Sequence, residues 1–291
     1  MAEAYIVSAV RTAGGRRGGR LAGWHPADLA AAVLDAAVDR AGIDPAAVDD
    51  VIMGCVGQAG EQSAHVGRNA VLASKLPQSV PAVSIDRQCG SSQQSIHFAA
   101  QAVMSGTQDV VIAAGVESMS RVPMGLPTTL PMQQGIGGSP WPKSVQERFG
   151  VAMFSQFTGA EMIARKYGHD RETLDRYALR SHERAIAATQ RGDFADEIVA
   201  VEVDGPDGSE PHRIDEGIRF DATYDSISSV KLLSADGVIS AASASQICDG
   251  ASAVLVASAE AVRAHGLTPL ARIHNLTVTA GDPVVMLEEP L

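Results

Sequence analysis

The feature that most constrains the fold is the alternation of short apolar runs with longer amphipathic segments between Ala4 and Ala114. The short runs have the length of buried strands, and the longer ones carry apolar residues at helical spacing. Pro26 suits the first turn of such a helix and Gly42 the position after its last turn. This order predicts a layered α/β domain with helices packed on a largely parallel sheet. The expected strands are Ala4–Val10, Val51–Val56, Ala82–Asp86 and Asp109–Ala114, and the expected helices are Pro26–Ala41, Val66–Ser74 and Ser91–Met104.

The alternation stops after Ser120. Pro, Gly, Gln and Thr dominate between Pro123 and Pro142, which predicts a long surface excursion. Two helices are expected next, followed by a short strand, and periodic apolar structure resumes at Ser240. We therefore predict a domain of residues 1–121 plus 225–268, an inserted domain of residues 122–224, and the start of a further unit at 269–291. The expected later elements are helices Gln156–Tyr167, Arg171–Gln190 and Ala259–His265 and strands Ile198–Val203, Ala251–Ala257 and Ala271–Val278.

Composition narrows the possible partners. The net charge of -11 argues against nucleic acid, because phosphate binding needs a basic face. The sequence contains no run of about 18 apolar residues, so a membrane span is not expected. The N-terminal run MAEAYIVSAVRT has no basic region ahead of an apolar stretch, so a signal peptide is not expected and cytoplasm is the default location.

The three cysteines predict neither a disulfide framework nor a metal site, because their number is odd and no CxxC spacing occurs. Cys89 stands between a predicted strand and a predicted helix rich in small residues. The start of a helix favours a thiolate by only about 0.3–1 kcal/mol, so a base such as histidine would also be needed. The pattern alone therefore favours a structural cysteine over a nucleophile at Cys89, and it predicts a packing role for Cys248.

A wider pattern changes that weighting. The run Val83–Gln94, VSIDRQCGSSQQ, resembles the nucleophile segment of thiolases, N-R-x-C-x-S-G-x-Q, with Asp86 in place of Asn and Ser92 in place of Gly. Altogether six segments resemble thiolase motifs in the family's order across almost the whole chain, which makes the resemblance specific. The other five begin at Arg11 (RTAGG), Gly115 (GVESMS), Tyr177 (YALRSH, then DEI at Asp196), Asp215 (DEGIR) and Asp236 (DG, through DGA at Asp249).

The resemblance implies a thiolase-like layered α/β fold: an N-terminal half-domain with an inserted loop domain, and a C-terminal half largely absent. It also implies an acyltransferase in which Cys89 forms an acyl-enzyme, cleaving 3-ketoacyl-CoA with CoA or condensing acyl-CoAs. CoA would be a substrate, no metal or prosthetic group would be needed, and a homodimer or homotetramer would be expected.

The same resemblance implies further site residues. Ser245 corresponds to a serine that contacts the pantetheine arm of CoA, and Arg219 is a candidate near the nucleotide end, with a solvated arginine as the alternative. Gln156 and Phe157 fall where the family has a His-Met pair at the pocket wall, although they are also compatible with ordinary helix positions. Met286 falls at an acyl-pocket methionine, but its flanking residues depart from the family's M-G-x-G-P.

Three thiolase motifs do not occur here: N-E-A-F, G-H-P-x-G-x-S-G and C-x-G-G-G. The last two carry the histidine and the second cysteine that would move protons, and none of the eight histidines is assigned to that role. We therefore expect a piece of a longer chain, inactive on its own, rather than a natural short homologue. The alternatives are a catalytically silent acyl-CoA-binding subunit and a ketoacyl synthase. The inserted domain and the R-x-C-x-S run disfavour the synthase.

Overall fold

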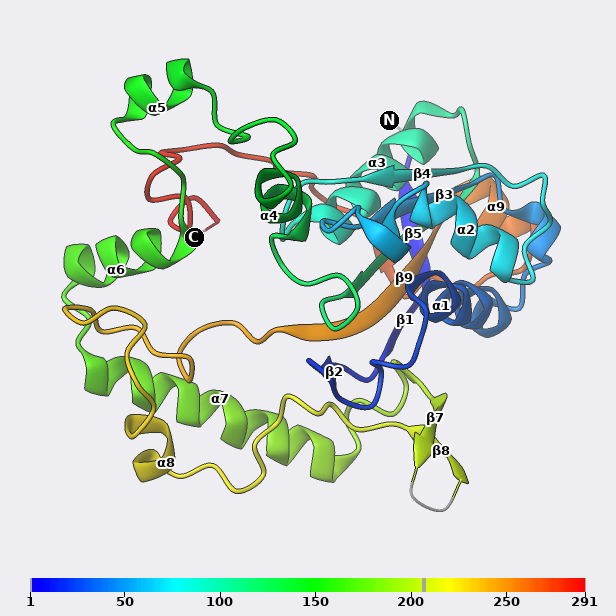
Figure 1. Ribbon diagram of the computed structural model, residues 1–291. Coiled ribbons are helices and arrows are strands. Elements are labelled where there is room, and N and C mark those ends of the chain that lie inside the picture. Colours follow the sequence, from blue (N-terminus) through cyan, green and yellow to red (C-terminus); the bar gives the residue numbers. More distant parts are fainter. Residues whose placement is uncertain (1, 206–207, 291) are drawn as a thin grey trace. The chain divides into compact units, whose positions relative to one another are not determined.

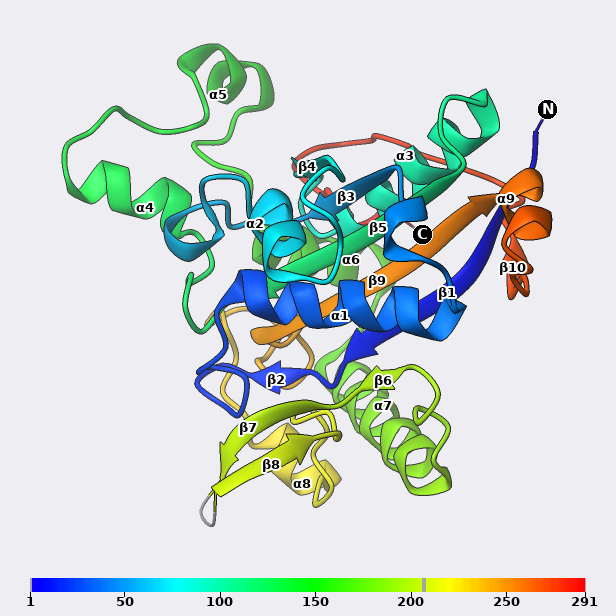
Figure 2. The same cartoon turned by 90° about the vertical axis from the view of Figure 1, so that its right-hand side faces the viewer.

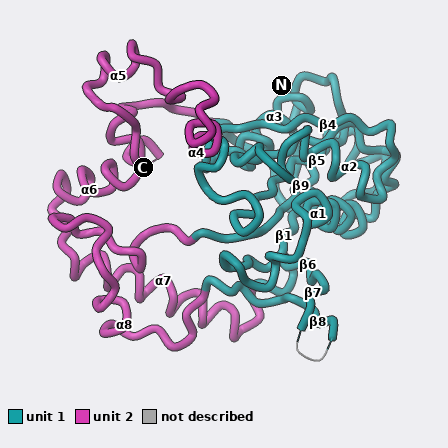
Figure 3. Tube along the Cα trace, in the orientation of Figure 1, with its two compact units in different colours: residues 1–127, 194–217, 247–276 teal, residues 128–193, 218–246, 277–291 magenta. Residues whose placement is uncertain are grey.

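The computed structural model of the protein describes residues 2–205 and 208–290. The chain divides into two compact units, coloured separately in Figure 3. Unit 1 contains residues 1–127, 194–217 and 247–276, and unit 2 contains residues 128–193, 218–246 and 277–291. No helix in the described ranges is both long and apolar enough to cross a membrane.

Unit 1 is built on one mixed sheet with the strand order β10-β1-β9-β5-β3-β4, with β2 also paired to β9 and β6 to β1 (Figures 1 and 2). β3 pairs in parallel with both β4 and β5, while β9 runs antiparallel between β1 and β5. The long strands β1, β3, β4 and β5 thus share one direction, as predicted, and β9 is the exception. The strands are β1 (Ala4–Thr12), β2 (Gly15–Arg16), β3 (Asp50–Gly54), β4 (Ala82–Ile85), β5 (Val110–Ser118), β6 (Ile198–Val199), β9 (Cys248–Ser258) and β10 (Ala271–Arg272).

Helices cover both faces of this sheet. α1 (Pro26–Ala41) and α2 (Val66–Ala73) pack with the strands in the larger apolar cluster, and Figure 2 shows α1 lying across β9 and β1. α3 (Ser91–Ser105) contributes Ala99, Ala100 and Val103 to a second cluster with other strand side chains. The predicted layered arrangement is therefore present in unit 1. Shorter helical segments are η1 (Pro45–Ala47), η2 (Gly60–Gln62) and α9 (Ala259–Ala264).

α1 shows why the sequence predicted its bounds correctly. Pro26 occupies the first turn, and the Nδ1 of His25 accepts a hydrogen bond from the backbone N–H of Ala27 at 3.2 Å. Gly42 ends the helix with a φ of 67°, a left-handed conformation that glycine adopts without steric cost. The buried face includes Leu29, Val33 and other apolar residues at helical spacing.

The segment 194–217 belongs to unit 1 although the sequence assigned it to the inserted domain. β6 extends the sheet beside β1, and the Arg11 guanidinium pairs with Glu197 at 2.7 Å and with Asp215 at 2.7 Å. β7 (Val201–Gly205) and β8 (Gly208–His212) form a separate antiparallel pair. The units also differ from the predicted division in placing residues 225–246 in unit 2 and 269–276 in unit 1.

Unit 2 is mainly helical. α6 and α7 match their predicted positions. α4 lies within 123–142, where a surface excursion was expected, and α5 follows that stretch at a position for which no element was predicted. Neither α4 nor α5 buries a residue, and α4 contains Pro131. Their sequences therefore lack the apolar periodicity that would predict a helix. The helices are α4 (Leu126–Gln133, which begins in unit 1), α5 (Lys143–Phe149), α6 (Gln156–Tyr167), α7 (Arg171–Arg191) and α8 (Tyr224–Ser228).

The predicted strand Ala271–Val278 is wrong beyond Arg272. β10 contains only Ala271 and Arg272, paired antiparallel with β1. From Ile273 to Val278 the backbone forms no regular strand. The backbone N–H of Ile273 still donates to the carbonyl of Ala4 at 2.9 Å, and the side chains of Ile273 and Leu276 pack against the cluster of α3.

Candidate active site

Cys89 lies in a short turn between the end of β4 and the start of α3. Within this turn Gln88 has a φ of 49°, a left-handed conformation that is uncommon for a residue other than glycine. The carboxylate of Asp86 accepts a hydrogen bond from the backbone N–H of Gln88 at 2.6 Å and another from the Gln88 side chain at 3.2 Å. Asp86 therefore holds the residue before the thiol in its unusual conformation.

Ser91 closes the other side of the same turn. Its Oγ accepts from the backbone N–H of Arg87 at 2.8 Å and donates to the carbonyl of Gln88 at 2.6 Å. Ser91 is buried, whereas Cys89 is exposed. The turn is thus fixed by partly buried hydrogen bonds of Ser91 while its thiol remains accessible, which is the arrangement that a nucleophile requires.

Two glycines let the first turn of α3 approach the sheet. A Cβ at Gly54, the last residue of β3, would lie 2.5 Å from the backbone carbonyl carbon of Ser91. A Cβ at Gly115 in β5 would lie 2.7 Å from the Cβ of Ser92. Because both distances are far below van der Waals contact, these positions require glycine. The position of the Cys89 turn therefore depends on two residues distant from it in sequence.

The three free cysteines have different surroundings. Cys55 is 1% exposed, and burial, together with the carboxylates of Glu117 and Asp86, raises the pKa of its thiol to about 12. Cys248 is exposed as a residue, so the predicted packing role is wrong, yet desolvation of its thiol and the nearby Asp249 raise its pKa. A higher pKa leaves less thiolate at neutral pH. Cys55 and Cys248 are therefore the less suitable nucleophiles.

Glu117 supports the loop that follows β3. Its carboxylate accepts hydrogen bonds from the backbone N–H groups of Val56 at 2.8 Å and Gly57 at 3.1 Å, and from Gln62 Nε2 at 2.8 Å. In the sequence, Glu117 is part of the GVESMS segment, and no contact was predicted for it. These bonds hold the loop next to Gly54, the residue against which α3 begins.

Five predicted residues lie in unit 2, whereas Cys89 lies in unit 1. Gln156 is the first residue of α6, and Phe157 follows it with a side chain that is 46% exposed. A Cβ at Gly159 of the same helix would run into the carbonyl of Val285, so the segment before Met286 lies directly against α6. The structure thus brings the neighbourhood of Met286 to the helix that carries Gln156 and Phe157.

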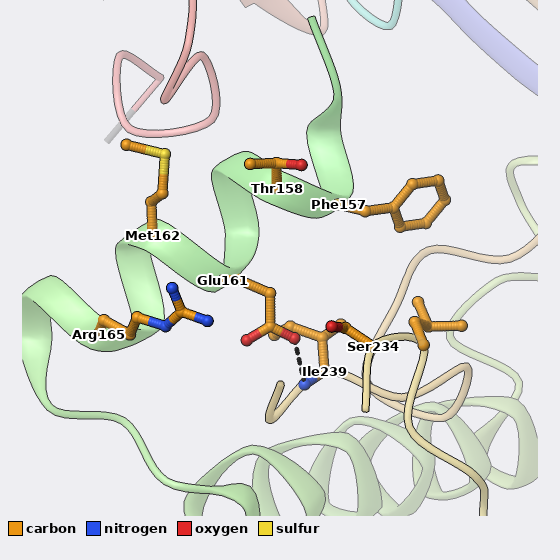
Figure 4. A pocket seen from close by; sticks show the side chains of 8 residues that line it. Phe157, Thr158, Glu161, Met162, Arg165, Ser234 and Ile239 are labelled. Atoms are coloured by element: carbon orange, nitrogen blue, oxygen red, sulfur yellow. Dashed lines mark hydrogen bonds between the residues drawn. The ribbon is translucent and has the colours of Figure 1, made fainter. Parts of the chain in front are cut away.

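Unit 2 contains a pocket of about 390 Å³ between α6 and the segment 233–239, shown in Figure 4. Four of its lining side chains are apolar and suit a hydrocarbon group, and the other four are polar or charged. Phe157 lines it, whereas Gln156 and Met286 do not. The lining residues are Phe157, Thr158, Glu161, Met162, Arg165, Leu233, Ser234 and Ile239.

Ser245 and Arg219 are both exposed. The backbone N–H of Arg219 donates to His182 Nδ1 at 3.2 Å, and burial, followed by the charge of Arg219, lowers the pKa of His182. A neutral His182 is therefore maintained as an acceptor that fixes the backbone at Arg219. The guanidinium of Arg219 is left at the surface, where an anionic group can reach it.

The family described as "Thiolase, N-terminal domain" matches residues 4–260. Steroid 3-ketoacyl-CoA thiolase FadA6 of Mycobacterium tuberculosis is 50% identical over 293 aligned positions, which cover 100% of this chain and 70% of that protein.

Two solved structures resemble the fold. The Bacillus anthracis acetyl-CoA acetyltransferase superposes with a TM-score of 0.81 at 34% identity, covering 94% of this chain and 69% of that one. Human mitochondrial 3-ketoacyl-CoA thiolase gives a TM-score of 0.79 at 33% identity, covering 93% of this chain and 69% of that one. The chain thus spans about 70% of the length of these relatives.

Proposed function

Because this chain belongs to the thiolase family, we propose that Cys89 is its acyl-accepting nucleophile and that its substrates are 3-ketoacyl-CoA and CoA. The observation that carries this proposal is the Cys89 turn. The thiol is exposed where α3 begins, in a turn closed by partly buried hydrogen bonds of Ser91 and by the Asp86–Gln88 contact.

In the degradative direction the Cys89 thiolate adds to the C3 carbonyl of a 3-ketoacyl-CoA. The C2–C3 bond then breaks, the acyl group stays on sulfur as a thioester, and the two-carbon fragment takes a proton and leaves as acetyl-CoA. The thiol of a second CoA loses its proton, attacks the acyl carbon and releases the Cys89 thiolate. The reverse sequence is a condensation. The steps so written need no metal or prosthetic group, and CoA enters as a substrate.

The relative at 50% identity is named as a steroid 3-ketoacyl-CoA thiolase, which supports a steroid-derived acyl group. Phe157, a rigid aromatic side chain on the wall of the unit 2 pocket, supports the same choice. We therefore expect a 3-ketoacyl-CoA derived from steroid degradation to acylate Cys89 faster than a linear 3-ketoacyl-CoA. Similar rates for the two substrates would count against this specificity.

Selective alkylation tests whether Cys89 is the nucleophile. Iodoacetamide should modify Cys89 much faster than Cys55 or Cys248, and an acyl-CoA should slow the reaction at Cys89. Slow and equal labelling of all three cysteines would favour the alternative hypothesis, a subunit that binds acyl-CoA but does not catalyse acyl transfer. An exposed reactive thiol remains reduced in the cytoplasm, which is the location we propose.

We also propose that the protein forms homo-oligomers through the edge of its sheet. β4 is the terminal strand, and an edge strand offers unpaired backbone groups to a second copy. Val83 on β4 is 41% exposed, and Phe98 on α3 is 39% exposed. Light scattering should therefore show a dimer or tetramer that Val83→Lys dissociates, and an unchanged mass for this variant would rule out the β4 edge.

A further inference from the structure

Glu161 of α6 carries a buried carboxylate and is 8% exposed. Both of its oxygens accept from the backbone N–H of Val238 at 3.0 Å, and Oε1 also accepts from Ile239 at 3.0 Å. A carboxylate is buried at a large desolvation cost unless hydrogen bonds satisfy it, and bonds to an ionised acceptor are strong. Glu161 therefore binds α6 firmly to the segment 238–239.

The absence of a side chain at Gly237 makes room for this contact. A Cβ at Gly237 would overlap Glu161 Oε1, so the carboxylate approaches only because the residue is glycine. The backbone N–H of Gly237 donates to the carbonyl of Ser234 at 3.1 Å and closes a turn. Ser234 and Ile239 at either end of this turn line the pocket. Figure 4 shows the Glu161 side chain reaching from α6 toward Ser234 and Ile239.

The turn continues into the segment that carries Ser245. Leu233 N–H donates to the carbonyl of Ile239 at 2.9 Å, and Leu232 forms an isolated antiparallel bridge with Ser240. Ser240 is fully buried, and its backbone N–H donates to Ser243 Oγ at 3.1 Å. A displacement at residues 238–239 would therefore be passed on to the residues just before Ser245.

We propose that Glu161 is a positioning residue that holds the turn 234–239 as the second wall of the pocket opposite Phe157, and thereby sets affinity for the CoA thioester. This inference rests on the proposed function, because it takes the pocket to receive part of that substrate. Neither the spacing of motifs nor the resemblance assigned Glu161 a role.

The test is calorimetric binding of CoA to the full 291-residue chain. Glu161→Ala should raise the Kd for CoA at least ten-fold, equivalent to about 1.4 kcal/mol. Glu161→Gln should give a smaller increase, because an amide offers one acceptor oxygen for two N–H groups. Gly237→Ala should also raise the Kd, because its Cβ would push the Glu161 carboxylate away from the backbone N–H groups of Val238 and Ile239.

The matched control is Glu147→Ala on α5, where an exposed glutamate pairs with Lys143 at 3.4 Å and CoA affinity should not change. Iodoacetamide labelling of Cys89 without ligand should proceed at the wild-type rate in every variant, because the Cys89 turn is closed within unit 1. A general loss of structure would alter that rate and would count against a positioning role.

A folded Glu161→Ala variant whose Kd lies within two-fold of wild type would overturn the inference. If Glu161→Ala does not fold, Gly237→Ala decides in the same way. If wild-type protein does not bind CoA, the pocket's role in the proposed function fails and the inference fails with it. Rapid labelling of Cys89 would still support the proposed nucleophile in that case.

Discussion

Gly54→Ala should disturb the site without altering any residue that touches substrate. The added Cβ would lie 2.5 Å from backbone atoms of both Ser91 and Ser92, about 1 Å closer than ordinary contact. Backbone atoms cannot rotate away as a flexible side chain can, and α3 also lies close to β5, where a Cβ at Gly115 would be 2.7 Å from the Cβ of Ser92. The first turn of α3, and the Cys89 turn with it, must therefore move.

Overpacking of this kind costs about 1–3 kcal/mol, and the loss of glycine's freedom in the unfolded chain returns about 0.4–1 kcal/mol. We expect Gly54→Ala to lower the free energy of unfolding by about 1–2 kcal/mol, measured by urea denaturation. Acylation of Cys89 should slow by at least ten-fold, because a misplacement of about 1 Å at a reacting group has a large effect.

Gly250→Ala in β9 is the matched control. Its Cβ would meet only Thr12 Oγ1 at 3.6 Å, an ordinary contact, so stability should be unchanged or slightly increased. The reasoning would be refuted if Gly54→Ala retained wild-type stability and acylated Cys89 at the wild-type rate.

Three further predictions concern the rest of the chain. Asp175→Ala should lower the free energy of unfolding by about 2–3 kcal/mol in urea denaturation, because it removes the buried carboxylate that pairs with Arg171. The hydrogen bond from Arg171 to the carbonyl of Val230 would remain and hold the unpaired guanidinium in place. A decrease below about 0.5 kcal/mol would contradict this prediction. Burial lowers the pKa of His212, so the folded protein binds a proton at this imidazole at lower pH than the unfolded chain does. The free energy of unfolding should therefore fall as the pH drops below about 6.5. His212→Gln should weaken this pH dependence. The expectation that these 291 residues do not turn over alone stays a prediction, which a steady-state assay with 3-ketoacyl-CoA and CoA tests.

The sequence predicted elements whose ends and buried faces are both encoded locally. α6 ends where Gly168 follows, and its bounds agree with the prediction. α4 was missed because it buries nothing. β10 was predicted too long because Ile273 and Leu276, which follow it, are apolar like strand residues but pack against the α3 cluster outside a regular strand. Apolar residues alone do not distinguish a strand from a packed irregular segment.

The site was predicted only in part. The resemblance located Cys89, but the left-handed Gln88 had no signal, because glutamine is not a residue typical of that conformation. Glu161 lies one turn after Phe157 and resembles a solvated helix residue until the chain returns 77 positions later to cover it. Contacts between such distant segments are set by the tertiary fold and leave no local pattern.

The central claim is that Cys89 carries the acyl group. The most direct measurement is to incubate the protein with a 3-ketoacyl-CoA at pH 8.5, where an ordinary thiol is about half ionised, then quench with acid and map the peptides by mass. The acyl mass should appear on the peptide that contains Cys89 and be absent from a Cys89→Ala variant. Acylation at Cys55 or Cys248, or none at all in folded protein, would contradict the account.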